Sequence, residues 1–218
     1  MRLWRTLLMM MCSMAVMGMS AHADDAELAA THATTPQVTI NSASKQLSLV
    51  SVPSFAFGKQ NSSDVSSAAK TYTAKTVVSQ LEVADTRGLG NGWSVSVKAS
   101  KFSKTKFTWF PLPSNKTYTL DGAVLTFGDP DSGVTGQTIT RADSGTTGGA
   151  PTASTGSITA SGKSADSVKL LSATNGNGIG VWDDHFNNNL ITLTVPKGAV
   201  KKDLSYTSTL TWTITAAE

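Results

Sequence analysis

The sequence predicts an all-β, single, sandwich-like domain of about ten to twelve short, mainly antiparallel strands with long Gly/Ser/Thr loops. Short stretches alternate apolar and polar residues, as half-buried strands do, and turn residues such as Gly, Asn and Asp separate them. No stretch carries a convincing apolar stripe at the 3.6-residue period of a helix. The composition shifts too little along the chain to indicate a second domain.

The expected strands lie in the alternating stretches. They are 37–41, 46–52, 79–86, 92–99, 105–110, 117–121, 123–128, 136–141, 156–161, 167–172, 190–196 and 205–215. Asp121-Gly122 predicts a tight hairpin between the two strands that flank it, because glycine accepts the positive φ of such a turn at low cost.

Two stretches are expected to lack extended strands. The best helical candidate runs from Ser62 to Lys75, but it is rich in Ser, Thr and Ala and weakly apolar, which predicts a turn or one short helix at most. Residues 143–157 are rich in Gly, Ser and Thr and predict a flexible excursion.

The first 23 residues have the pattern of a secretory signal peptide. Arg2 and Arg5 give a positive start, Leu7 to Met17 an apolar core, and Ala21-His22-Ala23 a cleavage site. This apolar run is too short to cross a hydrocarbon core of about 30 Å as a helix. We therefore expect a secreted, extracellular protein with no membrane insertion after signal cleavage.

The mature chain is expected to be a flexible lead-in, residues 24–36, followed by one domain, residues 37–218. The single cysteine, Cys12, lies in the signal peptide, so the mature chain has neither disulfides nor a thiolate nucleophile. Such a domain depends on its hydrophobic core for stability. Secretion without cysteines favours a bacterial exported protein.

The charge of the mature chain excludes a general nucleic-acid binder. Removing residues 1–23 leaves 16 Lys and Arg against 15 Asp and Glu, whereas a nucleic-acid-binding domain needs a strongly basic face. A local basic run remains, formed by Lys98, Lys101, Lys104 and Lys106. These lysines form either a solvated loop face or a contact for an anionic polymer.

The sequence predicts no catalytic residues, no metal site and no cofactor, and therefore no enzyme. Asp183-Asp184-His185 is the only dense group of chemical side chains, and without a second histidine nearby it is expected to be a solvated loop. The glycine-rich stretch 175–180 is followed by no helix pattern, so it predicts turns rather than a phosphate loop. The acids are scattered, whereas glycosidases need two opposed carboxylates.

Two tryptophan motifs lie far apart in the chain. They are Gly92-Trp93-Ser94-Val95-Ser96-Val97 and Leu210-Thr211-Trp212-Thr213-Ile214. On a strand, each tryptophan shares one face with aliphatic residues, and the opposite face carries hydroxyl groups. Three interpretations follow: the rings form core; they come together as one exposed strip that stacks on sugars; or they pack inward while the Ser and Thr faces bind.

Two further features surround these motifs. Asp85 and Arg87 are expected to form an exposed ion pair of small energetic value that sets how the strand enters the turn at Gly88 and Gly92. Outside the motifs, Trp109 is expected in the core or in an aromatic surface patch, and Trp182, after a glycine-rich stretch, on a loop.

The motifs together resemble the two signatures of the WxL domain. Leu81-Glu82-Val83-Ala84-Asp85-Thr86-Arg87-Gly88 followed by the Trp93 motif resembles the first, and the stretch from Tyr206 to Ile214 resembles the second. The likeness covers about residues 36–218. Val95 and Ile214 stand where the family name promises Leu, but both keep an aliphatic β-former on the same face.

The resemblance implies a non-catalytic surface protein of low-GC Gram-positive bacteria. Such domains attach non-covalently to the cell wall, with peptidoglycan as the expected ligand. If the basic run Lys98, Lys101, Lys104 and Lys106 is a binding contact rather than a solvated loop face, its partner on the wall would be an anionic wall polymer. The implied binding residues are Trp93, Val95, Tyr206, Leu210, Thr211, Trp212 and Ile214, supported by Asp85, Arg87, Gly88 and Gly92. No Leu-Pro-x-Thr-Gly sorting motif is present, which agrees with non-covalent attachment.

The alternative function is that of a structural or adhesive subunit. In that case the protein docks on another WxL protein or on a WxL-interacting surface protein, by strand addition or through an apolar patch, rather than binding the wall directly.

Overall fold

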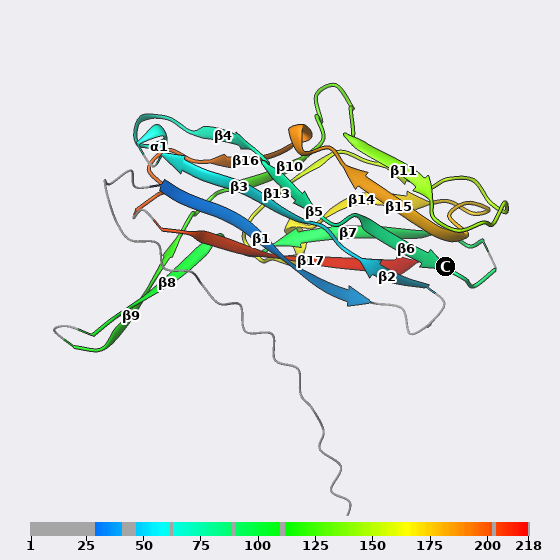
Figure 1. Cartoon of the computed structure of the whole chain (residues 1–218), viewed down its shortest axis with the longest axis horizontal. Helices are drawn as coiled ribbons and strands as arrows, with labels where there is room; N and C mark the ends of the chain where they lie inside the picture. Colours follow the sequence, from blue (N-terminus) through cyan, green and yellow to red (C-terminus); the bar gives the residue numbers. More distant parts are fainter. Residues whose placement is uncertain are drawn as a thin grey trace, which may run out of the picture.

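The computed structural model describes residues 29–40, 47–61, 63–88, 90–109, 112–201 and 204–217. The expected signal peptide, the start of the lead-in and Cys12 lie outside these residues. The described residues form a two-layered β structure from which one hairpin projects (Figure 1). No helix among them is long and apolar enough to cross a membrane.

One layer is a nine-stranded sheet. It contains β12 (Thr152–Ala153), β14 (Val168–Ala173), β7 (Trp93–Ala99), β17 (Tyr206–Ala216), β1 (Ala29–Ile40), β3 (Ser54–Asn61) and β5 (Thr76–Val78) in that order, with β8 (Ser103–Thr108) paired to β17 and β9 (Ser114–Thr119) paired to β8.

The other layer consists of two four-stranded sheets. One has the order β13 (Gly156–Thr159), β10 (Val124–Phe127), β16 (Ile191–Val195) and β4 (Lys70–Thr73); the other has the order β11 (Gln137–Arg141), β15 (Gly180–Phe186), β6 (Leu81–Asp85) and β2 (Leu47–Ser51). The helices are short: α1 (Asp64–Ser67) and the 3₁₀ turns η1 (Ser164–Asp166) and η2 (Asn188–Leu190).

The inner face of β17 meets both small sheets and joins the layers. The ring centroid of Trp212 lies 6.4 Å from that of Phe127 on β10 and 6.1 Å from that of Phe186 on β15. Phe55 on β3 adds an edge-to-face contact with Phe127 at 5.6 Å. Such aromatic pairs contribute packing energy beyond the area they bury. The predicted all-β sandwich is therefore confirmed.

The alternation read from the sequence sets which face of each strand is buried. Along β7, Trp93, Val95 and Val97 are buried while the residues between them are partly exposed, and β17 repeats this pattern. A sheet with one face on the core and one toward solvent gives such a pattern. β17 lies between β7, which runs antiparallel to it, and β1, which runs parallel.

The structure corrects the expected lead-in. Residues 29–36 belong to β1, where His32 pairs with Tyr206 in the parallel register and with Gly58 in the antiparallel one. The Ala/Thr-rich sequence of this segment shows little periodicity, but its backbone bonds to two long neighbouring strands.

The hairpin predicted at Asp121-Gly122 is wrong, although the turn itself is present. Gly122 has φ +74°, and the Ala123 N–H donates to the Leu120 carbonyl at 3.3 Å. However, β9 pairs with β8, whereas β10 pairs with β13 and β16. Leu120 and Ala123 are both fully buried, so the turn is fixed in the core and directs its two strands into different layers.

The strands number seventeen in the described residues rather than about ten to twelve. Those not expected from the sequence are β3, β4, β5, β12 and β15. The expected short helix is α1, which is followed directly by β4, and the excursion at residues 143–157 contains β12. The sequence did not predict β15, because glycine, aspartate and asparagine are depleted in strands and surround its few apolar residues.

Candidate functional site

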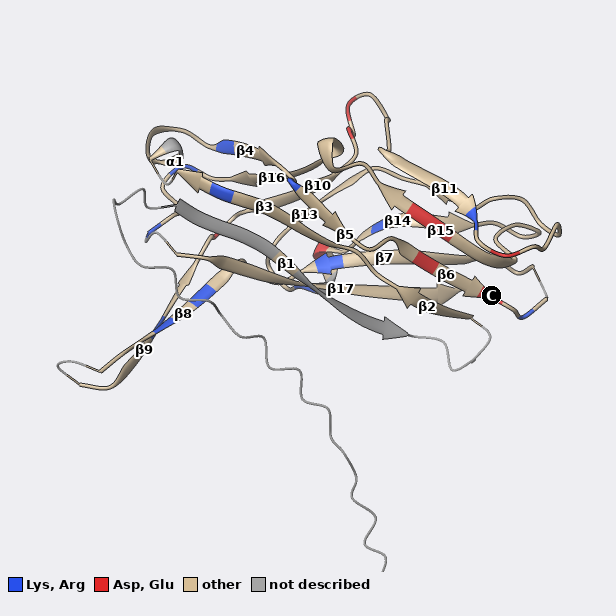
Figure 2. Cartoon of the chain, in the orientation of Figure 1, with Lys and Arg blue, Asp and Glu red and all other residues tan. Residues whose placement is uncertain are grey.

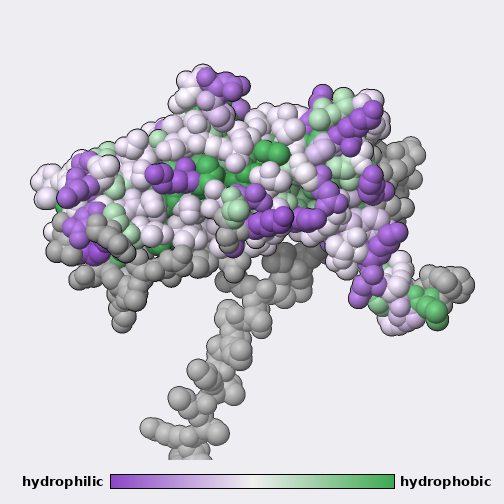
Figure 3. Space-filling view, turned by 180° about the vertical axis from the view of Figure 1, so that it is seen from behind, coloured by the Kyte–Doolittle hydropathy of each residue, from purple (hydrophilic) through white to green (hydrophobic). Residues whose placement is uncertain are grey.

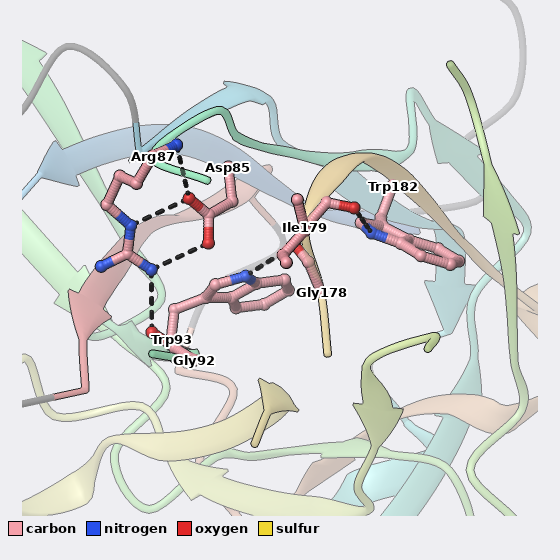
Figure 4. Close-up of polar contacts among 7 residues, drawn as sticks. All are labelled: Asp85, Arg87, Gly92, Trp93, Gly178, Ile179 and Trp182. Carbon is pink, nitrogen blue, oxygen red and sulfur yellow. Dashed lines mark hydrogen bonds and ion pairs between the residues drawn. The ribbon is translucent and has the colours of Figure 1, made fainter. Parts of the chain in front are cut away.

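The first signature folds around an ion pair. Arg87 donates to the two carboxylate oxygens of Asp85, from Nε to Oδ1 and from Nη2 to Oδ2, both at 2.8 Å, and from Nη2 to the Gly92 carbonyl at 2.9 Å (Figure 4). Hydrogen bonding to this carboxylate raises the pKa of Arg87 above its ordinary value. The expected pair is present but buried: the side chains of Arg87 and Asp85 are 10% and 1% exposed.

Two glycines let the turn and the Trp93 ring approach neighbouring backbone. Gly92 has φ +80°, and a Cβ there would lie 2.3 Å from the Ala173 carbonyl oxygen. The Trp93 Nε1–H donates to the Gly178 carbonyl at 3.1 Å, and a Cβ on Gly178 would lie 2.8 Å from that nitrogen (Figure 4). The indole ring is therefore anchored inside the domain.

The residues implied by the resemblance lie mainly in the core. Buried are Trp93, Val95, Tyr206, Leu210, Trp212 and Ile214, while Thr211 is half-buried, Gly92 is buried and Gly88 is exposed. Their burial rules out the exposed strip and agrees with the two interpretations in which the rings pack inward. Trp93 and Trp212 lie on adjacent strands, but Trp212 pairs with Val97 and Trp93 with Ala216. This four-residue offset, about 13 Å along a strand, excludes one continuous aromatic strip.

The outer face of the signature strands is rich in hydroxyl groups, which alternate with the buried residues. Cross-strand pairs between β7 and β17 on this face are Ser94–Thr215, Ser96–Thr213 and Lys98–Thr211, and pairs between β7 and β14 are Ser94–Ser172 and Ser96–Lys169. We call this surface the outer signature face.

A pocket of about 380 Å³, lined by both polar and apolar residues, opens at one end of the outer signature face. Its polar lining residues are Asn91, Ser94, Lys169, Ser172, Thr174 and Asn175, with the buried Trp93 behind them. Amides and hydroxyls both donate and accept hydrogen bonds, and lysine adds a cation. The pocket therefore offers partners for sugar hydroxyls, amide groups and carboxylates.

Sequence reasoning missed Lys169, Ser172 and Asn175 as site residues. Residues 168–172 do form a strand, as expected, but only its pairing with β7 brings Lys169 and Ser172 beside the first signature. Asn175-Gly176 is recognisable as a turn from its sequence, but the sequence does not show that this turn lies beside the first signature.

The basic run does not form one patch. Lys98 lies on β7 opposite Thr211, and Lys101 binds Asp121 with an Nζ–Oδ1 distance of 2.8 Å. Lys104 and Lys106 lie on β8 and are exposed. Only these last two point into solvent from the projecting hairpin, where Lys116, not considered from the sequence, faces Lys106.

The loop expected at Asp183-Asp184-His185 is instead part of β15. His185 is exposed, whereas Asp184 is fully buried and neither carboxylate oxygen has a hydrogen-bond partner among the described residues. Burial raises the pKa of Asp184 to about 7. In the described ranges no group of three or more His, Cys, Asp and Glu side chains is placed to hold a metal ion.

The expectation that a loop presents Trp182 is also wrong. Trp182 lies on the inner face of β15 and is 6% exposed. Its Nε1–H donates to the Ile179 carbonyl at 3.0 Å, and the guanidinium carbon of Arg141 lies 5.0 Å from the ring centroid. The ring is thus held by a hydrogen bond and a cation–π contact. Trp109, in contrast, is 76% exposed, as the surface interpretation predicted.

The comparison with protein families agrees with the fold and the motifs. The family model described as WxL domain surface cell wall-binding matches residues 24–217. No curated protein and no solved structure matches the chain. This family binds cell walls and is not a catalytic one, which places the protein at the cell surface. Because the match covers nearly the whole chain, the protein belongs to the WxL domain family of cell-wall-binding surface proteins.

Proposed function

We propose that this protein is secreted, is non-catalytic and attaches non-covalently to the bacterial cell wall by binding peptidoglycan on the outer signature face. The observation that carries the proposal is the pocket beside Trp93 with its rim of amides, hydroxyls and Lys169, which lies where the outer faces of β7 and β14 meet the first signature. Peptidoglycan offers sugar hydroxyls, acetamido groups and peptide carboxylates. The amides, hydroxyls and Lys169 of the pocket are matching partners for these groups.

In this proposal the signature tryptophans position the binding face rather than touch the ligand. Trp93 and Trp212 fill the core beneath it, and the Asp85–Arg87 pair fixes the turn that leads into β7. A residue that only supports the face can still abolish binding when it is replaced, because the strands that carry the hydroxyl groups lose their packing. A supporting role of this kind explains why the signature side chains are buried although they matter for binding.

The test is co-sedimentation of residues 24–218 with purified peptidoglycan stripped of phosphate polymers. We expect saturable binding by the native chain. Replacing Lys169 and Asn175 by alanine should weaken it strongly, because both are exposed pocket residues whose loss leaves the core intact. The matched control replaces Lys70 and Asn189 by alanine; both are exposed and lie outside the pocket. This control should bind like the native chain.

Two outcomes would contradict the proposal. If the native chain does not pellet with stripped peptidoglycan, direct binding fails and docking on a partner surface protein becomes the better explanation. If the native chain pellets but the Lys169/Asn175 variant pellets equally well, peptidoglycan binds at another surface. Near-ultraviolet circular dichroism of each variant confirms that its aromatic core has kept native packing.

A further inference from the structure

The β8–β9 hairpin is an arm that projects from the sandwich (Figure 1). Its strands pair over six residues each, from Ser103–Thr119 to Thr108–Ser114, while only the Ser103–Thr207 pair joins it to β17. Six strand residues extend about 20 Å. Beyond Ser103 every residue of β8 is exposed, so the arm contributes little to the core.

One face of this arm carries aromatic and polar groups suited to sugars. The rings of Phe107 and Trp109 meet edge to face at 5.0 Å, and the two residues are 48% and 76% exposed. Asn115 lies opposite Phe107, and the Thr105 and Thr117 hydroxyls, also on this face, are 2.9 Å apart. Exposed rings stack on the apolar faces of sugar rings, while amides and hydroxyls bind sugar hydroxyls.

Exposed apolar side chains are concentrated on this arm. Of the six exposed large hydrophobic residues in the described part of the chain, Phe107, Trp109 and Leu112 belong to it. Figure 3 shows hydrophobic residues at the far end of the hairpin and hydrophilic ones nearer its base. Clusters of exposed apolar groups mark interaction sites, so this end of the arm is a candidate contact surface.

The opposite face of the arm is basic. Lys104 and Lys106 are two residues apart on β8 and point to the same side, and Lys106 pairs directly with Lys116 on β9. Figure 2 shows basic residues along the hairpin. Lys116 also lies 5.3 Å from the ring centroid of Tyr118. The sequence holds no Asp or Glu between residues 103 and 119, so no acid on the hairpin offsets these charges. Two like charges directly across a strand pair destabilise it, and a bound anion would relieve that repulsion.

The basic face continues into a pocket of about 500 Å³ along the outer edge of β9. Lys116, Lys197 and Lys201 line it together with Tyr118 and Asp121. The Asp121 carboxylate already accepts hydrogen bonds from Lys101 and Thr119, and the bond from Lys101 is the main cause of its lowered pKa. The pocket therefore remains positively charged and prolongs the row of lysines from the arm onto the body.

We propose that the β8–β9 arm binds an anionic glycopolymer of the cell wall, a chain of sugars joined by phosphates. Its sugars contact the face of Phe107 and Trp109, and its phosphates contact Lys104, Lys106 and Lys116. This proposal rests on the proposed function, since it adds a second wall contact remote from the outer signature face. The two contacts have different ligands, so each can fail alone.

The test measures binding of residues 24–218 to intact walls that retain phosphate polymers, to the same walls stripped of them, and to soluble glycosylated poly(glycerol phosphate). One variant replaces Lys104, Lys106 and Lys116 by glutamine, and another replaces Phe107 and Trp109 by serine. The matched control replaces the exposed Lys59, Lys70 and Lys163 by glutamine.

We expect the native chain to bind intact walls more tightly than stripped walls. Both arm variants should lose about tenfold or more in affinity for intact walls and for the soluble polymer, and should bind stripped walls like the native chain. Raising the salt concentration from about 0.1 M to about 1 M shortens the Debye length from about 10 Å to about 3 Å. This should weaken only the part of the binding that depends on Lys104, Lys106 and Lys116.

Three results would overturn the proposal. The arm variants could bind intact walls and soluble polymer normally, or they could lose affinity for stripped walls to the same extent. They could also leave polymer binding unchanged and lose binding to vesicles containing anionic lipids, which would assign the arm to a membrane surface. The Lys169/Asn175 variant tests the proposed function independently of these three results. If that function is correct, this variant loses binding to stripped walls while the arm variants keep it.

Discussion

The two signatures and the β8–β9 arm, together with the residues at the base of the arm, contain the same kinds of residue in opposite surroundings. Trp212 is fully buried and Trp109 is 76% exposed. The Arg87–Asp85 and Lys101–Asp121 ion pairs both have N–O distances of 2.8 Å, yet the first is buried and the second exposed. A motif therefore does not reveal by itself whether its residues bind a ligand. Here the residues that identify the family build the core, while the exposed residues that could bind lie elsewhere.

The largest expected effect separates the two tryptophans. Trp212→Ala should lower the free energy of unfolding by about 3–5 kcal/mol, because it leaves a cavity where the large sheet meets both small ones. Trp109→Ala should change it by no more than about 0.5 kcal/mol, because the ring contacts mainly solvent and Phe107. Urea denaturation followed by circular dichroism measures both, and equal effects would remove the contrast between core and arm.

A pH-dependent effect is expected next, from Asp184. With its pKa raised to about 7 by burial, the folded chain holds a proton on Asp184 that the unfolded chain releases near pH 4. Between these two values the unfolded state binds fewer protons, so stability falls as the pH rises. The penalty is absent below about pH 4 and complete above about pH 7, where it reaches at most about 4 kcal/mol.

Replacing Asp184 by asparagine tests this dependence. Relative to the native chain, Asp184→Asn should gain stability progressively between about pH 4 and pH 7, up to the same limit of about 4 kcal/mol. Acids such as Asp143, whose pKa is lowered mainly by a backbone hydrogen bond from Val181, occur in both proteins and cancel in the difference. A difference that does not vary with pH would mean that the pKa of Asp184 is the same in the folded and unfolded chains.

The two ion pairs give the next contrast. Asp85→Asn should destabilise the domain by about 3 kcal/mol, because it leaves the nearly buried Arg87 guanidinium without its counter-charge. Asp121→Asn should produce no resolvable change, since both partners of that pair are exposed. Thermal and urea unfolding report both. The double variant Asp85→Asn/Arg87→Met should recover part of the loss, and no recovery would assign the effect to the turn rather than to the unpaired charge.

The sequence predicted the buried faces of the strands better than it predicted which residues form the candidate site. The alternation in β7 and β17 correctly predicted which residues share a face, because side-chain direction follows from local backbone geometry. It could not show that Trp93 and Trp212 are offset by four residues, because register depends on distant strands. The same limit concealed Lys169, which reaches the first signature only through the pairing of β14 with β7.

Burial of polar residues was the other feature that the sequence did not reveal. Asp183-Asp184-His185 looked like a solvated loop because charged residues are rarely buried. Its neighbours Trp182 and Phe186 lie on the inner face of β15, and Asp184 between them is carried into the core by the same alternation. The Asp85–Arg87 pair is similar: its partners were identifiable from their spacing, but its burial depends on β15, which pairs with β6.

The smallest expected effect concerns the lysines that face each other on the arm. Lys106→Glu turns the repulsive Lys106–Lys116 pair into an attractive one and should stabilise the hairpin by a few tenths of a kcal/mol, roughly the size of cross-strand pair energies. Amide hydrogen exchange in β8 and β9 should therefore slow slightly. The same substitution should weaken binding to intact walls, because it removes a cation and adds an anion. Stability and binding then change in opposite directions, as expected for a repulsive pair that serves to bind an anionic ligand. Faster exchange in β8 and β9, or unchanged binding to intact walls, would mean that the lysine pair has no such role.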